Sequence, residues 1–108
     1  MSEVTTEEGL VLLTLVVSRS VEDTVLDLLL AHPDIVPGFT THPAEGHGAR
    51  VALHEPREQV MGSARRLAIR IVSSRETANG VIALLKESLS GAKVFYWVVP
   101  VLEAGRIG

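Results

Sequence analysis

The sequence predicts an α+β domain whose elements follow the order β-α-β-β-α-β. Leu10–Val17 and Val94–Leu102 are nearly continuous apolar runs close to the two ends of the chain, a pattern typical of buried strands. Between them, two stretches carry apolar residues at helical spacing, and each follows a serine that can cap a helix. The chain of 108 residues has room for one domain.

In the first half of the chain, Ser20 is expected to cap a helix that His32-Pro33 ends. A second strand is expected over Ile35–Thr41. The apolar stripe of this first helix consists of Val21, Val25, Leu28 and Leu29.

In the second half, Leu67–Ser73 alternates between apolar and mixed positions, as a third strand does. Ser74 is expected to cap the second helix, which ends by Gly91. Pro100 cannot donate to a strand ladder, so it marks the last strand as an edge or bulge. The stripe of the second helix consists of Ala78, Val81, Ile82, Leu85 and Leu89.

These elements predict a ferredoxin-like sandwich, in which a four-stranded antiparallel sheet carries two helices on one face. The first and last strands are apolar on both faces, whereas a sheet covered on one side should alternate. The second face therefore needs a cover, and self-association is the expected one. Residues 1–8 are expected to form a flexible arm, and residues 9–108 the domain.

The composition of the chain argues against several classes of function. Charged residues are 21% and the net charge is -3, which argues against nucleic acid as a partner. The absence of cysteine excludes disulfides and thiol chemistry. The apolar run after Gly9 is far shorter than the ~20 residues of a membrane span, so no membrane insertion is expected. The expected location is the cytoplasm.

Residues 42–62 show no sustained period and are predicted to form a long loop between strands two and three. Three of the four histidines lie there, namely His42, His47 and His54, together with Glu45. Imidazole and carboxylate groups can bind Zn, Ni, Co or Cu ions. The spacings match no standard zinc signature, so exposed histidines that bind no metal are the alternative. The remaining histidine, His32, is expected to cap the first helix.

Several motifs resemble the PII signalling superfamily. They are Gly38-Phe39, Gly46-His47-Gly48, Glu58-Gln59-Val60-x-Gly62, Tyr96-Trp97-Val98-x-Pro100-Val101 and Gly105-Arg106-Ile107. The combination is similar to a branch encoded beside heavy-metal efflux pumps of the resistance-nodulation-division class. The resemblance implies a homotrimer with a mobile loop between strands two and three, and a membrane transporter as a possible partner.

The resemblance also implies a ligand site in the cleft between subunits, where members of the superfamily bind adenine nucleotides. Gly38 matches a loop-base glycine, Lys93 a turn lysine, and Arg106 an arginine after the last strand. Gly46 and Gly48 could in addition wrap an anion through backbone N–H groups. Thr40–His42 stands where the family has a Gln-Lys pair, so nucleotide binding stays open.

Three functions are therefore compared. The first is a PII-like regulator that binds a small ligand or metal ion and modulates a partner. The second is a metal-buffering trimer of the CutA type that has no protein partner. The third, a small enzyme or amino-acid sensor, ranks last because the chain has no nucleophile elbow, Walker loop or zinc-protease helix.

Overall fold

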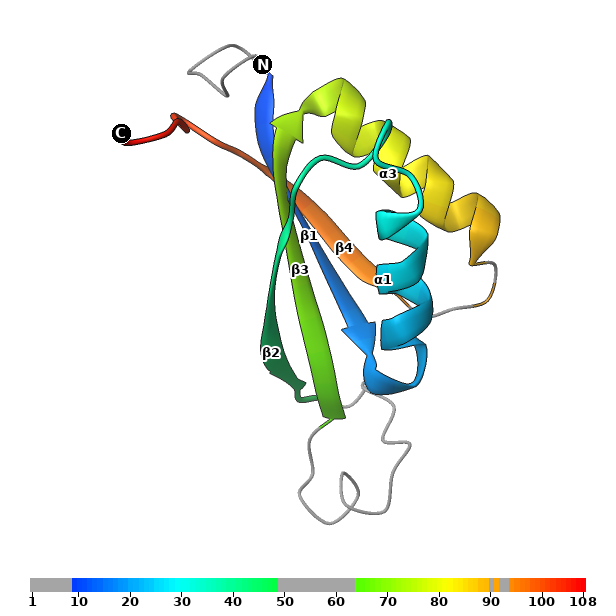
Figure 1. The fold of residues 1–108 in the computed structure, drawn as a ribbon. Helices are drawn as coiled ribbons and strands as arrows, with labels where there is room; N and C mark the ends of the chain where they lie inside the picture. Colours follow the sequence, from blue (N-terminus) through cyan, green and yellow to red (C-terminus); the bar gives the residue numbers. More distant parts are fainter. Residues whose placement is uncertain (1–8, 49–63, 90, 92–93) are drawn as a thin grey trace.

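The computed structural model describes residues 9–48, 64–89, 91 and 94–108. The predicted order of elements is confirmed (Figure 1). In chain order the elements are β1 (Leu10–Ser18), a 3₁₀ turn η1 (Arg19–Val21), α1 (Glu22–Leu30), β2 (Thr40–Gly46), β3 (Ala64–Ser74), α3 (Arg75–Ser88) and β4 (Phe95–Pro100).

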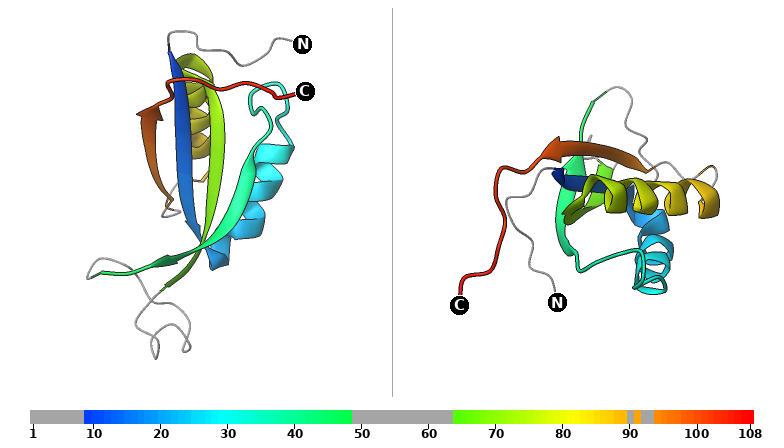
Figure 2. Two further views of the ribbon diagram at one scale, coloured as in Figure 1. Left: turned by 90° about the vertical axis from the view of Figure 1, so that its left-hand side faces the viewer. Right: turned by 90° about the horizontal axis from the view of Figure 1, so that it is seen from above.

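The four strands form one antiparallel sheet in the order β2-β3-β1-β4. Both helices lie on the same side of this sheet, as Figures 1 and 2 show. The ferredoxin-like fold class predicted above is therefore confirmed. Strands β1 and β3 are central, and β2 and β4 are the two edges. The edge position predicted from Pro100 is also confirmed.

The core lies between the sheet and the helices. Leu13 and Leu15 of β1 and Ile69 and Ile71 of β3 point toward the helices and are almost fully buried. Each such side chain contributes roughly 1.5–3 kcal/mol to folding through its burial. The helices complete this core with Val25 and Leu29 from α1 and Ala78, Val81 and Leu85 from α3.

The opposite face of the sheet is covered by no helix of the described chain. The register places Thr14 between Arg70 and Trp97, so these three residues lie on that face. Phe95 and Val99 share it, because they alternate with Trp97 along β4. Phe95, Trp97 and Val99 are 61%, 49% and 40% exposed. We call this surface the uncovered face; its apolar character was the reason for predicting self-association.

The predicted position of the second strand was wrong. Ile35 and Val36 do not extend; instead their N–H groups donate to the carbonyl of His32, and Val36 packs into the core. Strand β2 starts at Thr40 and continues to Gly46, through the first five residues of the predicted loop. Its polar sequence concealed it, because an edge strand of this kind contributes backbone hydrogen bonds rather than apolar side chains.

The predicted cap at Ser20 was also wrong. The chain first forms the 3₁₀ turn, and α1 begins at Glu22 without a side-chain cap. The Ser20 hydroxyl lies 3.0 Å from that of Ser18 instead. At the second helix the prediction is confirmed, since the N–H of Thr77 donates to Ser74 Oγ over 3.1 Å. The strands also differ at their ends from the predicted ranges, with β3 longer and β4 shorter.

Replacing Leu13 with Ala tests the core. We expect the free energy of unfolding to fall by about 2–5 kcal/mol, because Leu13 is fully buried and its removal leaves a cavity. Leu30→Ala is the matched control, since Leu30 is 68% exposed and surface changes usually stay within about 0.5 kcal/mol. Urea denaturation measures both. Equal losses in the two variants would contradict this position of the core.

Replacing Ser74 with Ala tests the helix cap. The variant should lose about 0.5–2 kcal/mol of stability, because the N–H of Thr77 loses its acceptor. Ser20→Ala is the control, since Ser20 caps no helix here. Thermal unfolding compares the two, and a larger loss in Ser20→Ala would contradict the assignment.

Candidate functional site

The histidine-bearing segment lies on β2 and just beyond its end. Glu45 pairs in register with Arg65, and His42 pairs with Ala68. Because side chains alternate along a strand, His42 and Glu45 point to opposite faces of the sheet. They therefore cannot share one ion while β2 keeps this conformation.

Glu45 and His47 do come together. His47 Nε2 lies 3.5 Å from Glu45 Oε2, and both side chains are more than half exposed. His42 Nδ1 lies 3.2 Å from the Pro43 carbonyl oxygen. Within residues 9–48, 64–89, 91 and 94–108, no three His, Asp or Glu side chains are placed to hold a metal ion. The fourth predicted ligand, His54, lies outside the described residues.

The residues predicted for a nucleotide-type cleft are spread over several elements. Gly38 borders a groove of about 510 Å³ beside the end of α1. Gly46 closes β2, and Gly48 follows with a φ of 121° that favours glycine. Arg106 lies in the C-terminal segment after β4, which leaves the sheet and extends outward (Figures 1 and 2). Lys93 lies outside the described residues.

His32 is placed as predicted. Its Nδ1 lies 2.9 Å from the carbonyl oxygen of Leu28, four residues earlier, so the imidazole satisfies a carbonyl at the end of α1. This contact accounts for His32 as a capping residue at the end of α1.

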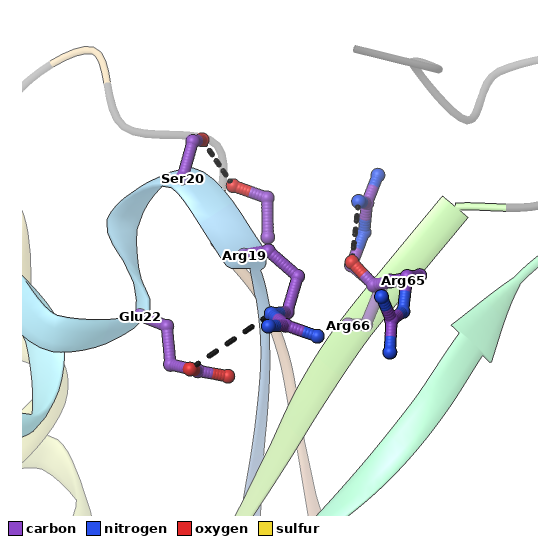
Figure 3. Close-up of polar contacts among 6 residues, drawn as sticks. Arg19, Ser20, Glu22, Arg65 and Arg66 are labelled. Atoms are coloured by element: carbon purple, nitrogen blue, oxygen red, sulfur yellow. Dashed lines mark hydrogen bonds and ion pairs between the residues drawn. The ribbon is translucent and has the colours of Figure 1, made fainter. Parts of the chain in front are cut away.

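Sequence analysis missed a cluster of arginines at the end of the sheet where β1 ends and β3 begins. Figure 3 shows Arg19, Arg65 and Arg66 in this region. Arg19 Nε lies 4.0 Å from Glu22 Oε2, and Arg66 Nη1 donates to the Arg65 carbonyl oxygen over 3.2 Å. Only the Arg65-Arg66 pair is visible in the sequence, because Arg19 joins it through the pairing of β1 with β3.

The uncovered face carries arginine side chains from β3. Register places Arg66 opposite Ala44 and Arg70 opposite Thr40, so both arginines share one face of β3. His42 lies between them on the same face of β2. The half of the uncovered face formed by β2 and β3 is therefore the more polar one, although Ala68 and Val72 also lie on it, and the half formed by β1 and β4 is mainly apolar. An anionic group fits the polar half better than a cation does.

A family model described as "Protein of unknown function (DUF3240)" matches residues 7–108. The chain belongs to this family. A DUF3240 protein from Shewanella baltica has a similar structure, with a TM-score of 0.73 at 16% identity, covering 94% of this chain and 100% of that one. No curated protein sequence matches this chain.

Two further solved structures resemble this DUF3240 chain. A nitrogen regulatory PII-like protein from Thiomonas intermedia, bound to ADP, AMP and bicarbonate, has a TM-score of 0.63 at 16% identity, covering 91% of this chain and 94% of that one. CutA from Synechococcus elongatus, complexed with Bis-Tris, has a TM-score of 0.65 at 14% identity, covering 97% and 88%. At such identities the likeness shows a shared fold. The predicted PII-like fold is thereby confirmed.

One more finding concerns the membrane. In the part of the chain that the structure describes, neither helix has the length and apolar character needed to cross a bilayer.

Proposed function

We propose that this DUF3240 protein is a PII-like regulator that assembles as a homotrimer in the cytoplasm, binds a small ligand or metal ion, and modulates a partner protein. The observation that carries the proposal is the uncovered face. Its exposed Phe95 and Trp97 lie beside the half-buried Leu12 and Val16 of β1, and contact with other copies would remove this apolar area from water.

The C-terminal segment supports the same assembly. Leu102 and Ile107 are 92% and 105% exposed on a segment that extends away from its own sheet. Apolar side chains so placed gain from contact with a neighbouring copy. Arg106 lies between them in sequence, and in a trimer it would be carried toward the neighbour's surface.

The ligand proposed for the regulator is an adenine nucleotide or a divalent transition metal. The structural neighbour bound to ADP, AMP and bicarbonate supports the nucleotide. The Glu45–His47 pair supports the metal, with His54, or His42 of a neighbouring copy, as a further donor. A metal site would need at least one such donor, because structural and catalytic zinc sites use three or four protein ligands.

The proposed partner is a membrane transporter, and the family resemblance to efflux-linked proteins favours a heavy-metal efflux pump. The competing proposal is a metal-buffering trimer of the CutA type without a partner, which the fold of the Synechococcus CutA supports equally. Neither proposal requires catalysis, and we propose no enzymatic activity. Co-purification of a transporter with the tagged protein from its native membranes would favour the regulator.

Trp97→Lys tests the assembly. The substitution places a cation in the apolar half of the uncovered face, opposite Thr14, which pairs with Arg70 on its other side. Sedimentation equilibrium should show trimers for the wild type and a shift toward monomers for the variant at micromolar concentration. Leu30→Lys is the control, because Leu30 is exposed on the helix side. A monomeric wild type would overturn the proposed architecture.

A thermal-shift screen of ATP, ADP, AMP and Zn, Ni, Co and Cu ions tests the ligand. A ligand at 100 times its Kd should stabilise the protein by about 2.7 kcal/mol, because it binds only the folded state. For a metal, the gain should shrink in the Glu45→Gln and His47→Ala variants and persist in His32→Ala, whose imidazole contacts only a helix carbonyl. A metal shift that all three variants retain would exclude the Glu45–His47 pair. If neither nucleotides nor metals shift the melting temperature, the proposed ligand classes are wrong.

A further inference from the structure

A cavity of about 230 Å³ lies on the helix side of the sheet, between α3 and β4. Ile82 and Leu85 of α3 form one wall together with Leu89, which caps the end of the helix, and Leu15 of β1 contributes from the sheet. Val94, just before β4, lines it as well. The cavity is thus bounded by aliphatic side chains on several sides.

The packing of α3 explains why this space exists. The helix lies mainly against β1 and β3, the two central strands, and much less against β4. Beyond the end of α3 the chain turns through Gly91, whose φ is 87°, before it returns along the sheet edge. The edge strand and the helix therefore diverge, and no described side chain fills the gap between them.

Among the described residues, the rim of the cavity carries one cation, Lys86. Lys86 Nζ lies 5.8 Å from the centroid of the Tyr96 ring, within the range of a cation–π contact. Register places Tyr96 opposite Leu15, on the helix side of β4. Among the described residues, no Asp or Glu carboxylate lies within ion-pair distance of Lys86.

We propose that this cavity binds a small apolar carboxylate, such as a medium-chain alkanoate or an arylalkanoate. The alkyl or aryl body occupies the space lined by Leu15, Ile82 and Leu85. The carboxylate lies at the rim, where the Lys86 ammonium supplies the opposite charge and the Tyr96 hydroxyl is a second donor. An apolar concavity with a few polar groups at one end is the usual form of a small-molecule site.

The described side chains that line the cavity favour an apolar carboxylate over other classes of ligand. A nucleotide or phosphate needs several donors around its oxygens, whereas the described lining offers a single cationic side chain. A metal ion needs His or carboxylate ligands, and none of the described lining side chains is of that kind. A neutral apolar molecule would gain nothing from Lys86, and an amine would be repelled by it.

The cavity is separate from the features used for the proposed function. It lies on the helix side, whereas His42 and Trp97 lie on the uncovered face. The inference therefore does not rest on the regulator proposal. Failure of the nucleotide and metal screen would leave it intact, and its own failure would leave that screen unaffected.

Calorimetric titration of the full-length protein with butanoate, hexanoate and octanoate tests the inference. Each added methylene should tighten binding about three- to fourfold until the cavity is full, because each one removes apolar surface from water. Hexanol and hexylamine are the matched ligands that lack the negative charge, and both should bind at least tenfold more weakly than hexanoate. Amide chemical shifts in ¹⁵N-labelled protein should change at Leu85, Leu89 and Tyr96.

Substitutions can test the contribution of the Lys86 charge separately from that of the apolar cavity. Lys86→Met keeps the aliphatic stem and removes the ammonium, so hexanoate affinity should fall about tenfold while hexanol affinity stays the same. Ile82→Phe fills the cavity and should remove the binding of both ligands. Arg75→Gln is the control, because it removes a cation from the first residue of α3 and should leave hexanoate affinity unchanged.

Three results would overturn the inference. They are equal binding of hexanoate, hexanol and hexylamine, the absence of any saturable binding, and chemical-shift changes confined to residues away from α3 and β4. A cavity filled by a neighbouring copy would give the second result. If Ile82→Phe does not fold, the comparison of Lys86→Met with Arg75→Gln still decides the role of the charge.

Discussion

The constraint on which this structure depends is that β1 is apolar on both faces and lies in the middle of the sheet. Leu13 and Leu15 on one face are buried by the helices, whereas Leu12 and Val16 on the other face look toward open space. In the described part of the chain both helices lie on the first face, and no helix covers the second. The homotrimer proposed above would bury that second face against other copies of the chain.

The apolar centre of the sheet also determines where the polar side chains lie. The apolar side chains of β1 take up the middle of the sheet, so polar and titratable groups gather on β2, on the neighbouring β3 and on the segments that follow the strands. Edge strands also tolerate residues that a central strand would exclude, as Pro43 in β2 and Pro100 in β4 show. The uncovered face follows this division, with Arg66, Arg70 and His42 toward the β2 edge and Phe95 and Trp97 toward the β4 edge.

The sequence predicted an element correctly where the local side-chain pattern itself determines the structure. The β1 run, the alternation of β3 and the cap at Ser74 all depend on local residue choice, and each was recovered. It failed at β2, because Thr40–Gly46 pairs through its backbone and has no apolar pattern to detect. Ser20 resembles Ser74 as a cap, but the intervening 3₁₀ turn moves the N-cap position by one residue to Val21, a shift that the sequence does not reveal.

The features of the site were harder to predict, because they arise from pairing between distant segments. Arg19 follows Ser18, which pairs with Arg66, so Arg19 lies in the same region as Arg65 and Arg66 only because β1 pairs with β3. The separation of His42 from Glu45 requires knowing that both lie on a strand rather than a loop. The cavity beside Lys86 depends on where α3 lies across the sheet, and no residue spacing encodes that position.

Strand β4 connects the two sides of the molecule. It is bonded within the sheet only to β1, and alternation sends Tyr96 toward the helix-side cavity and Phe95 and Trp97 toward the uncovered face. A displacement of β4 therefore changes the cavity and the apolar half of the uncovered face together. For such a displacement to act as a signal, a ligand must bind one position of β4 more tightly than the other. The coupling would then be reciprocal, so that assembly through the uncovered face would alter affinity at the cavity by the same factor.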